Sequence, residues 1–445
     1  MNGKIWIDLT DLRQWNGHFT GTQRVTYEIS KRYHENSENV HFFYYDQYLR
    51  LFIETNLDLP KYENKAYIKP VDSKTGNNLN ESFRSKFITK YNSLPLSIKN
   101  ILTINRIKLL IRKYISIKQR IQNIASIFFN NVVGILKPNN KLQAINFQNE
   151  DTVIILGKPW DTMSFIEDLK IMKIQNSFKL INLIYDMIPT FMPHLFGYPL
   201  PQNYTKYMFE SISLSNSIIA ISKNTKKDIE LFCKEILIKV PPIEIITLGV
   251  NDFSILTQKP QILDNLKINN YILCIGTLEI RKNHQLLYNA YREASRIGVK
   301  LPQLIICGGR GWYTEDIIHE INNDPVVKDS ILIINSPTDS EILWLYKNCK
   351  FTVYPSVYEG WGLPIAESLY HGKFCISSST SSMPEIAGSL LEYFSPYDAK
   401  SCMDLIVKYS NKKNLEEKEF KIKEYKYSSW DDTYNQFSKI LNKTE

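Results

Sequence analysis

The sequence predicts an α/β protein built from two doubly wound, Rossmann-like domains. Residues 351–388 give the clearest indication: a β-prone run, a turn with two glycines, a helix opened by Pro364 and a second β-prone run. Short apolar runs suited to buried strands recur elsewhere, for example at 151–156, 179–185 and 271–275. A chain of 445 residues exceeds one typical domain, so two domains of about 200 residues each are expected.

The remaining elements follow from the same patterns. Strands are expected at 4–9, 41–45, 217–221, 244–248, 304–307, 331–334, 351–354 and 374–376. Helices are expected after Gly21, at 223–232 with Ser222 as N-cap, at 340–346 and at 430–441, whereas 11–20 is expected to be a polar loop and 251–266 a hinge. Beyond Gly388 the chain is expected to be helical and charged.

Two carboxylates lie at separate points of the 351–388 unit. Glu359 is in the glycine turn, and Glu367 follows eight residues later, about one turn inside the expected helix. The first N–H groups of a helix have no partner within it and carry partial positive charge, so this helix start suits a phosphate. Carboxylates on either side are then placed to accept hydrogen bonds from sugar hydroxyls. The alternative interpretation is a capping carboxylate plus an ordinary exposed glutamate.

Other candidate residues follow strands. Asp186 comes directly after the run at 179–185, at a carboxyl end where the sites of α/β proteins gather. Arg281 and Lys282 come after the run at 271–275, where two cations could neutralise a diphosphate, although an isolated Arg–Lys pair is more often solvated surface. Gly21 separates the first strand from the first helix, which suits either a phosphate contact or a tight loop.

Composition excludes several classes of protein. Six cysteines show no Cys-x-x-Cys pair and several lie in β-prone runs, so buried reduced thiols are expected rather than disulfides or zinc ligands. The amino terminus is a strand pattern rather than a signal peptide, and no apolar run approaches the roughly 20 residues that span a bilayer. A cytoplasmic protein is therefore expected.

Basic residues are concentrated in one place. Residues 82–149 contain no Asp or Glu but twelve Lys and Arg, against a net charge of +8 for the whole chain. Within this stretch Arg106, Lys113 and Arg120 recur every seven residues beside an apolar helical face. A basic amphipathic helix at 82–141 is typical of binding to a membrane surface, and a packed insertion with a solvated basic face is the equal alternative. No nucleic-acid partner is expected.

The glutamate pair carries a resemblance to a known family. Glu359-Gly-Trp-Gly-Leu-Pro, with Glu367 eight residues later, resembles the paired-glutamate motif of retaining glycosyltransferases of family 4, which have the two-domain GT-B fold. Ser381-Ser382-Met383-Pro384-Glu385 is similar to the family's continuation. The resemblance covers nearly the whole chain, least well at 51–149. It implies two Rossmann-like domains facing a central cleft: an acceptor-side domain at 1–255, a nucleotide-sugar-binding domain at 256–425, and a helix at 426–445 that crosses back.

Residue roles on the donor follow from the resemblance. Glu367 would bind the ribose hydroxyls and Glu359 would face the donor hexose. The donor sugar and diphosphate would be held by the backbone of Gly360, Trp361, Gly362 and Leu363, and approached from the other domain by Gly21 and Thr22. Lys282 matches the family's phosphate-binding loop.

Two departures from the family pattern bear on the remaining roles. Thr277 stands where many members have arginine, so Arg281 is the expected substitute. Tyr185 replaces a frequent histidine before Asp186, so only Asp186 is carried over, as a candidate for positioning the acceptor.

The expected function is hexose transfer with retention from a nucleotide-diphosphate sugar to a glycan or lipid-linked acceptor in surface polysaccharide synthesis. GDP-mannose is the favoured donor, by resemblance to bacterial mannosyltransferases. No Asp-x-Asp occurs, so no metal is implied, and no cofactor is expected. A catalytically silent nucleotide-sugar-binding protein of GT-B fold is the alternative. An α/β oxidoreductase is disfavoured because the G-x-G-x-x-G fingerprint is absent after the first strand.

Overall fold

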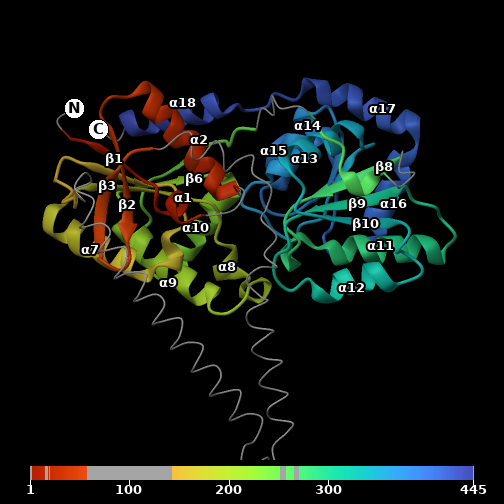
Figure 1. Ribbon diagram of the computed structural model, residues 1–445, viewed down its shortest axis with the longest axis horizontal. Coiled ribbons are helices and arrows are strands. Elements are labelled where there is room, and N and C mark those ends of the chain that lie inside the picture. The colour runs from red at the N-terminus through yellow and green to blue at the C-terminus, as the bar shows by residue number, and fades with distance from the viewer. Residues whose placement is uncertain are drawn as a thin grey trace, which may run out of the picture. The chain divides into compact units, whose positions relative to one another are not determined.

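The computed structural model describes residues 3–15, 19, 21–57, 143–250, 257–264 and 270–443, and Figure 1 shows its elements. The expected basic insertion at 82–141 and much of the expected hinge at 251–266 lie outside the described residues. Among the described residues, no helix combines the length and apolar character that crossing a bilayer requires.

The first sheet has seven strands in the order β3-β2-β1-β4-β5-β6-β7. All neighbours are parallel except β3, which pairs antiparallel with β2 at the edge. Its strands are β1 (Ile5–Asp8), β2 (Val40–Asp46), β3 (Leu51–Thr55), β4 (Thr152–Ile155), β5 (Lys179–Ile184), β6 (Ser217–Ala220) and β7 (Ile243–Ile245). The chain winds outward from β1 to β2 and returns to β4 on the other side, so the winding direction switches between β1 and β4.

The second sheet has six parallel strands in the order β10-β9-β8-β11-β12-β13. They are β8 (Tyr271–Ile275), β9 (Gln303–Gly308), β10 (Ile331–Asn335), β11 (Thr352–Tyr354), β12 (Cys375–Ser378) and β13 (Glu392–Phe394). Its winding direction switches between β8 and β11. The structure therefore confirms the prediction of two Rossmann-like sheets.

Helices connect the strands of both sheets. Those of the first are α1 (Thr10–Gln14), α2 (Gly21–Asn36), α7 (Met163–Asn176), α8 (Ile188–Phe191), α9 (Leu200–Leu214) and α10 (Lys223–Glu235). Those of the second are α11 (His284–Arg296), α12 (Glu315–Asn323), α13 (Asp339–Asn348), α14 (Leu363–Tyr370), α15 (Met383–Ala387), α16 (Ala399–Ser410) and α17 (Lys412–Lys421). A last helix, α18 (Trp430–Lys443), packs against α2 in the core of the first sheet, where the Tyr33 hydroxyl lies 2.9 Å from Ser438 Oγ.

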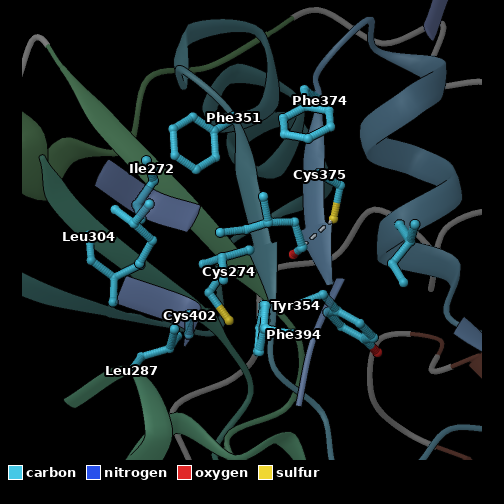
Figure 2. Close-up of a cluster of buried hydrophobic side chains, with 14 of the residues drawn as sticks. Ile272, Cys274, Leu287, Leu304, Phe351, Tyr354, Phe374, Cys375, Phe394 and Cys402 are labelled. Carbon is cyan, nitrogen blue, oxygen red and sulfur yellow. Dashed lines mark hydrogen bonds between the residues drawn. The ribbon is translucent and has the colours of Figure 1, made fainter. Parts of the chain in front are cut away.

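Alternation along the strands builds the core of the second sheet. Ile272, Cys274 and Leu304 are buried on one face, and Leu287 of α11 and Cys402 of α16 pack on the same cluster (Figure 2). The residues between them in sequence face the other side, where a separate cluster packs against α13. All six cysteines are free and buried, as the sequence predicted.

Several expected elements are confirmed and others were missed. The Ser222 side chain accepts a hydrogen bond from Thr225 N at the start of α10, as predicted. The expected loop at 11–20 is wrong in part, because Asp8 accepts the N–H of Thr10 and α1 begins there. The expectation of helix alone beyond Gly388 is also wrong: β13 pairs with β12, and three residues are too few to show a strand period.

Candidate functional site

The loops after β8 and β11 meet where the second sheet switches winding direction. The loop after β8 contains a short 3-10 helix, Ile280–Lys282, and therefore presents Arg281 and Lys282. The loop after β11 runs through Glu359 to the start of α14. Open α/β sheets bind ligands in the crevice at this point. The fold thus brings together candidates that the sequence placed about 80 residues apart.

Glu359 is the centre of a buried ion-pair cluster. Lys282 Nζ donates to Glu359 Oε1 at 2.7 Å, and Arg281 donates from one guanidinium nitrogen to Glu359 Oε2 at 2.5 Å. The Tyr354 hydroxyl donates to Glu359 Oε1 at 2.9 Å, and the other terminal nitrogen of Arg281 bonds Glu279 at 2.6 Å. Glu359 is therefore held in one orientation by three donors.

Charge pairing decides the ionisation of this cluster. Burial alone would raise the pKa of Glu359, but Arg281 and Lys282 outweigh it and lower the pKa to about 2. Burial likewise opposes the charge on Arg281, and Glu359 and Glu279 raise its pKa well above the ordinary value. Glu359 and Arg281 therefore stay charged at neutral pH.

The turn into α14 is shaped by its glycine and by two serines. Gly362 has φ 130°, which side chains rarely adopt, and a Cβ there would lie 2.9 Å from Ile386 Cδ1. Ser381 Oγ accepts the N–H of Glu359, and Ser382 Oγ donates to the carbonyls of Glu359 and Trp361. These serines, recognised in the sequence only as a motif continuation, fix the turn that presents the helix start.

Glu367 is partly buried rather than an exposed helix residue. The Tyr346 hydroxyl donates to Glu367 Oε2 at 3.0 Å. Burial raises the pKa of Glu367 to about 6, although Tyr346 and the nearby Arg24 oppose the shift. Arg24 belongs to α2 of the first sheet and lies 3.5 Å from Asp339 at the start of α13. Sequence analysis had given Arg24 and Tyr346 no role.

The candidates from the first sheet face the same turn. A Cβ on Gly360 would lie 2.2 Å from the carbonyl oxygen of Tyr185 and 3.1 Å from Asp186 Cβ, so only glycine fits there. A Cβ on Gly21 would lie 3.6 Å from Leu363 Cδ1 at the start of α14. Burial raises the pKa of Asp186, and Arg281 opposes this. Asp186 and Gly21 are thus brought to opposite parts of the Gly360–Leu363 turn.

Contacts between residues of the two sheets surround this turn. The Glu385 carboxylate accepts the N–H groups of Lys223 and Asn224 at 2.8 and 2.7 Å, at the start of α10. The Tyr358 hydroxyl donates to the carboxylate of Asp228 at 2.9 Å, also on α10. Sequence reasoning missed these contacts, although Tyr358 directly precedes Glu359 and Glu385 closes the quoted motif.

The arrangement is chemically suited to an anion beside a polyhydroxylated group. Two cations and the start of α14 supply positive charge, while Glu359, Asp186 and Glu367 supply carboxylates that can accept hydrogen bonds. Two buried donors, Trp361 Nε1 and Arg281 Nε, have no hydrogen-bond partner within the described ranges. Such donors are costly unless something supplies an acceptor.

Comparison with known proteins agrees with this geometry. Residues 257–428 match the sequence model of the family Glycosyl transferases group 1. O-antigen chain mannosyltransferase B of Escherichia coli is 35% identical over 118 residues, which are 26% of this chain and 31% of that protein. O-antigen chain mannosyltransferase RfbU of Salmonella typhimurium is 24% identical over 235 residues, 53% of this chain and 60% of that protein. The matched region thus spans less than two thirds of either relative.

The fold has solved counterparts. The crystal structure of HepE from Anabaena in complex with UDP and glucose superposes with a TM-score of 0.59 at 11% identity, covering 99% of both chains. At that identity the likeness concerns the fold, which is the two-domain GT-B architecture. The chain therefore has the two-domain GT-B fold, and its residues 257–428 carry the sequence pattern of the family Glycosyl transferases group 1.

Proposed function

We propose that the chain is a retaining, metal-independent glycosyltransferase that moves a hexose from a nucleotide-diphosphate sugar to a hydroxyl of a glycan or lipid-linked acceptor. GDP-mannose is the favoured donor, because the curated relatives are named as mannosyltransferases of O-antigen chains. The same names support a role in surface polysaccharide synthesis.

One observation carries the proposal: Arg281, Lys282 and Glu359 are clustered at the turn into α14, with Asp186 of the first sheet beside Gly360. A nucleotide diphosphate needs cations and free N–H groups, which this turn offers. A sugar needs acceptors for its hydroxyl groups, and the carboxylates of Glu359 and Asp186 would accept hydrogen bonds from them. Glu367, one turn further along α14, would accept the ribose hydroxyls.

The chemistry assigned to these residues is charge stabilisation. The acceptor oxygen forms a bond to the anomeric carbon as the bond from that carbon to the diphosphate oxygen breaks, and the diphosphate leaves with the electron pair. The acceptor proton passes to an oxygen of the leaving diphosphate. Arg281, Lys282 and the start of α14 stabilise the charge that develops on the diphosphate, the largest single contribution in many enzymes.

Glu359 would keep the two cations in place before the donor binds. The carboxylate shares Lys282 and Arg281 with the incoming diphosphate, so part of the electrostatic attraction is already satisfied. Its other expected role, facing the hexose, would use the second lone pair of Oε2, because Oε1 already accepts from both Lys282 and Tyr354.

The test is a turnover assay on the full chain with GDP-mannose, UDP-glucose and UDP-N-acetylglucosamine, each screened first by thermal shift. Release of nucleoside diphosphate together with a glycosylated product is expected for one donor, and product NMR should show the anomeric configuration of the donor. If the chain binds a donor but transfers sugar to none of the glycan or lipid-linked acceptors, the result would instead favour the catalytically silent binding protein.

Peripheral attachment to the inner leaflet through residues 82–141 stays a proposal, because that segment lies outside the described residues. Its support is the run of twelve bases without an acid. Each base near an anionic surface contributes about 1 kcal/mol. Co-sedimentation with anionic but not neutral vesicles, reversed by salt and weakened by changing Arg106, Lys113 and Arg120 to Glu, is expected. Equal recovery with both vesicle types at low salt would contradict it.

A further inference from the structure

A second candidate site lies at the switch point of the first sheet. A cavity of about 210 Å³ opens between the segments that follow β1 and β4. These strands pair in parallel, so their carboxyl ends lie at the same edge of the sheet. The cavity is lined by Thr10, Asp11, Gln14, Trp15, Lys158, Pro159, Asp161 and Thr162. It occupies in the first sheet the position that the Glu359 cluster occupies in the second, where open α/β sheets bind ligands.

The cavity wall combines charges of both signs with an aromatic ring. Lys158 Nζ lies 4.8 Å from the centre of the Trp15 ring and 3.8 Å from Asp161 Oδ2. Asp11 is 8% exposed, and both of its carboxylate oxygens accept hydrogen bonds from Gln23 Nε2, at 2.9 and 2.8 Å. A Cβ on Gly157 would lie 2.9 Å from Asp11 Cβ, so the wall is closely packed there. The lining is therefore built rather than a loose surface hollow.

These groups select the chemistry of the ligand. The lining carries two carboxylates, Asp11 and Asp161, against the one ammonium of Lys158, so it repels a phosphate or carboxylate. Asp161 already has Lys158 Nζ 3.8 Å from its Oδ2 as a counter-charge, which weakens its attraction for a metal cation. A neutral polyhydroxylated ring satisfies all of them, because its hydroxyls donate to the carboxylates and accept from the ammonium while its C–H face packs on the indole. The volume is below the roughly 300–1,000 Å³ of sites for larger ligands, which suits a single ring.

The walls of the cavity are tied to the segments that face α14. Gln23, which holds Asp11, lies two residues after Gly21 on α2. The Tyr185 hydroxyl donates at 2.6 Å to the carbonyl of Leu156, just before the Gly157–Lys158 wall, and Tyr185 directly precedes Asp186. A ring bound in the cavity would therefore be fixed relative to the proposed reaction site, and such positioning is a large part of catalysis.

We propose that this cavity is an acceptor subsite that binds one monosaccharide unit of the glycan, held by Lys158 and Asp161 against Trp15. The assignment of the bound sugar as the acceptor rests on the proposed function. The binding of a sugar ring in the cavity does not depend on it. It adds to the donor site a second, separately testable sugar site.

The experiment is saturation-transfer NMR on the full chain with the methyl α-glycosides of mannose, glucose and N-acetylglucosamine. At least one glycoside should receive saturation from the wild-type chain, and its dissociation constant should rise about tenfold or more in Lys158→Met and Asp161→Asn, each of which loses a hydrogen bond to a charged group. Lys206→Met, a change at an exposed lysine of α9, is the matched control and should bind like the wild type.

Calorimetry with GDP-mannose and UDP-glucose on the same variants separates the two proposals and reports on folding. Donor affinity should be unchanged in Lys158→Met and Asp161→Asn. A wild-type chain that binds none of the glycosides, or variants that bind them as well as Lys206→Met does, would overturn the subsite. Glycoside binding in a chain that binds no donor would leave the sugar site standing and refute the proposed function instead.

Discussion

The Lys282 ammonium donates a hydrogen bond of 2.7 Å to Glu359 Oε1, so two residues expected to serve different parts of the donor hold one another. Arg281 bonds the other oxygen of the same carboxylate. A lowering of the Glu359 pKa from its ordinary 4.5 to about 2 corresponds to roughly 3 kcal/mol. Glu359 is therefore both a candidate ligand for the sugar and the group that stabilises the two cations proposed to bind phosphate.

The change Glu359→Gln tests this double role through stability. Removing the carboxylate charge leaves Lys282 without its anionic partner and leaves Arg281 with Glu279 alone, so the melting temperature should fall. A nucleoside diphosphate replaces the missing anion, so it should raise the melting temperature of Glu359→Gln by more degrees than that of the wild type. Differential scanning fluorimetry with and without GDP and UDP measures both effects.

The control for that change is Glu293→Gln, which removes an exposed ion pair to Arg296 and should have little effect.

The sign of the pH dependence follows from the lowered pKa. The contribution of Glu359 is present above pH 4.5 and is lost as the pH falls toward 2, so Glu359→Gln should lack this part of the acid sensitivity. Equal nucleotide-induced shifts in variant and wild type would show that the diphosphate does not engage these cations.

Arg281 and Lys282 should replace a metal at the leaving diphosphate. Activity is expected to survive EDTA. Arg281→Ala combined with Lys282→Ala should lower kcat/KM, and the fall should correspond to several kcal/mol of lost transition-state stabilisation. Since the double change also leaves the buried Glu359 and Glu279 without these cations, Lys282→Arg provides the charge-conserving comparison. A strict magnesium requirement at the chemical step, or a nearly active double variant with normal stability, would refute the assignment.

The donor-side candidates could be predicted because their information is local. The glycine turn, Pro364 and Gly372 limit the backbone whatever surrounds them, and Gly372 indeed has φ 70° after α14. The strands were predictable because buried parallel strands form continuous apolar runs. The short edge strand β13 and helix α1 were not, since three to five residues show no period.

The contacts between the two sheets could not be predicted in the same way. Tyr358 and Asp228 are 130 residues apart, and Glu385 and Lys223 are 162 residues apart. No local propensity or spacing encodes which of many exposed carboxylates will meet a helix start in another part of the fold. The burial that raises the pKa of Glu367 has the same origin, because it depends on Tyr346 and Arg24 from distant segments.

Glu367 should make donor binding depend on pH. Folding raises the pKa of Glu367 and so favours its protonated carboxyl group. The contribution of this protonated form to the stability of the fold is complete below pH 4.5 and is lost as the pH rises through about 6. Ribose hydroxyls need the ionised acceptor, of which about a tenth remains one unit below the pKa. The affinity for GDP-mannose should therefore fall about tenfold from pH 7 to 5 in the wild type.

Two changes at Glu367 check this assignment by calorimetry. Glu367→Gln should remove the pH dependence between 5 and 7, and a nucleotide sugar is the ligand to use because its diphosphate does not titrate in that range. Glu367→Ala loses a hydrogen bond from the ribose to a charged group, which should cost about 1.5–3 kcal/mol, or about ten- to a hundred-fold in affinity. Unchanged affinity in Glu367→Ala would remove this residue from the site.

Glu385 should act on the donor site without contacting the donor. Its carboxylate accepts the first N–H groups of α10 and thereby links the segment that follows Ser381 and Ser382 to the first sheet. Loss of a carboxylate at a helix start costs about 1 kcal/mol, so Glu385→Ala should lower the melting temperature slightly. Because Ser381 and Ser382 hold the Glu359 turn, Glu385→Ala should also reduce kcat more than it weakens nucleotide binding. Glu417→Ala, at an exposed position of α17, is the matched control, and identical kinetics for the two variants would mean that the contact is structural only.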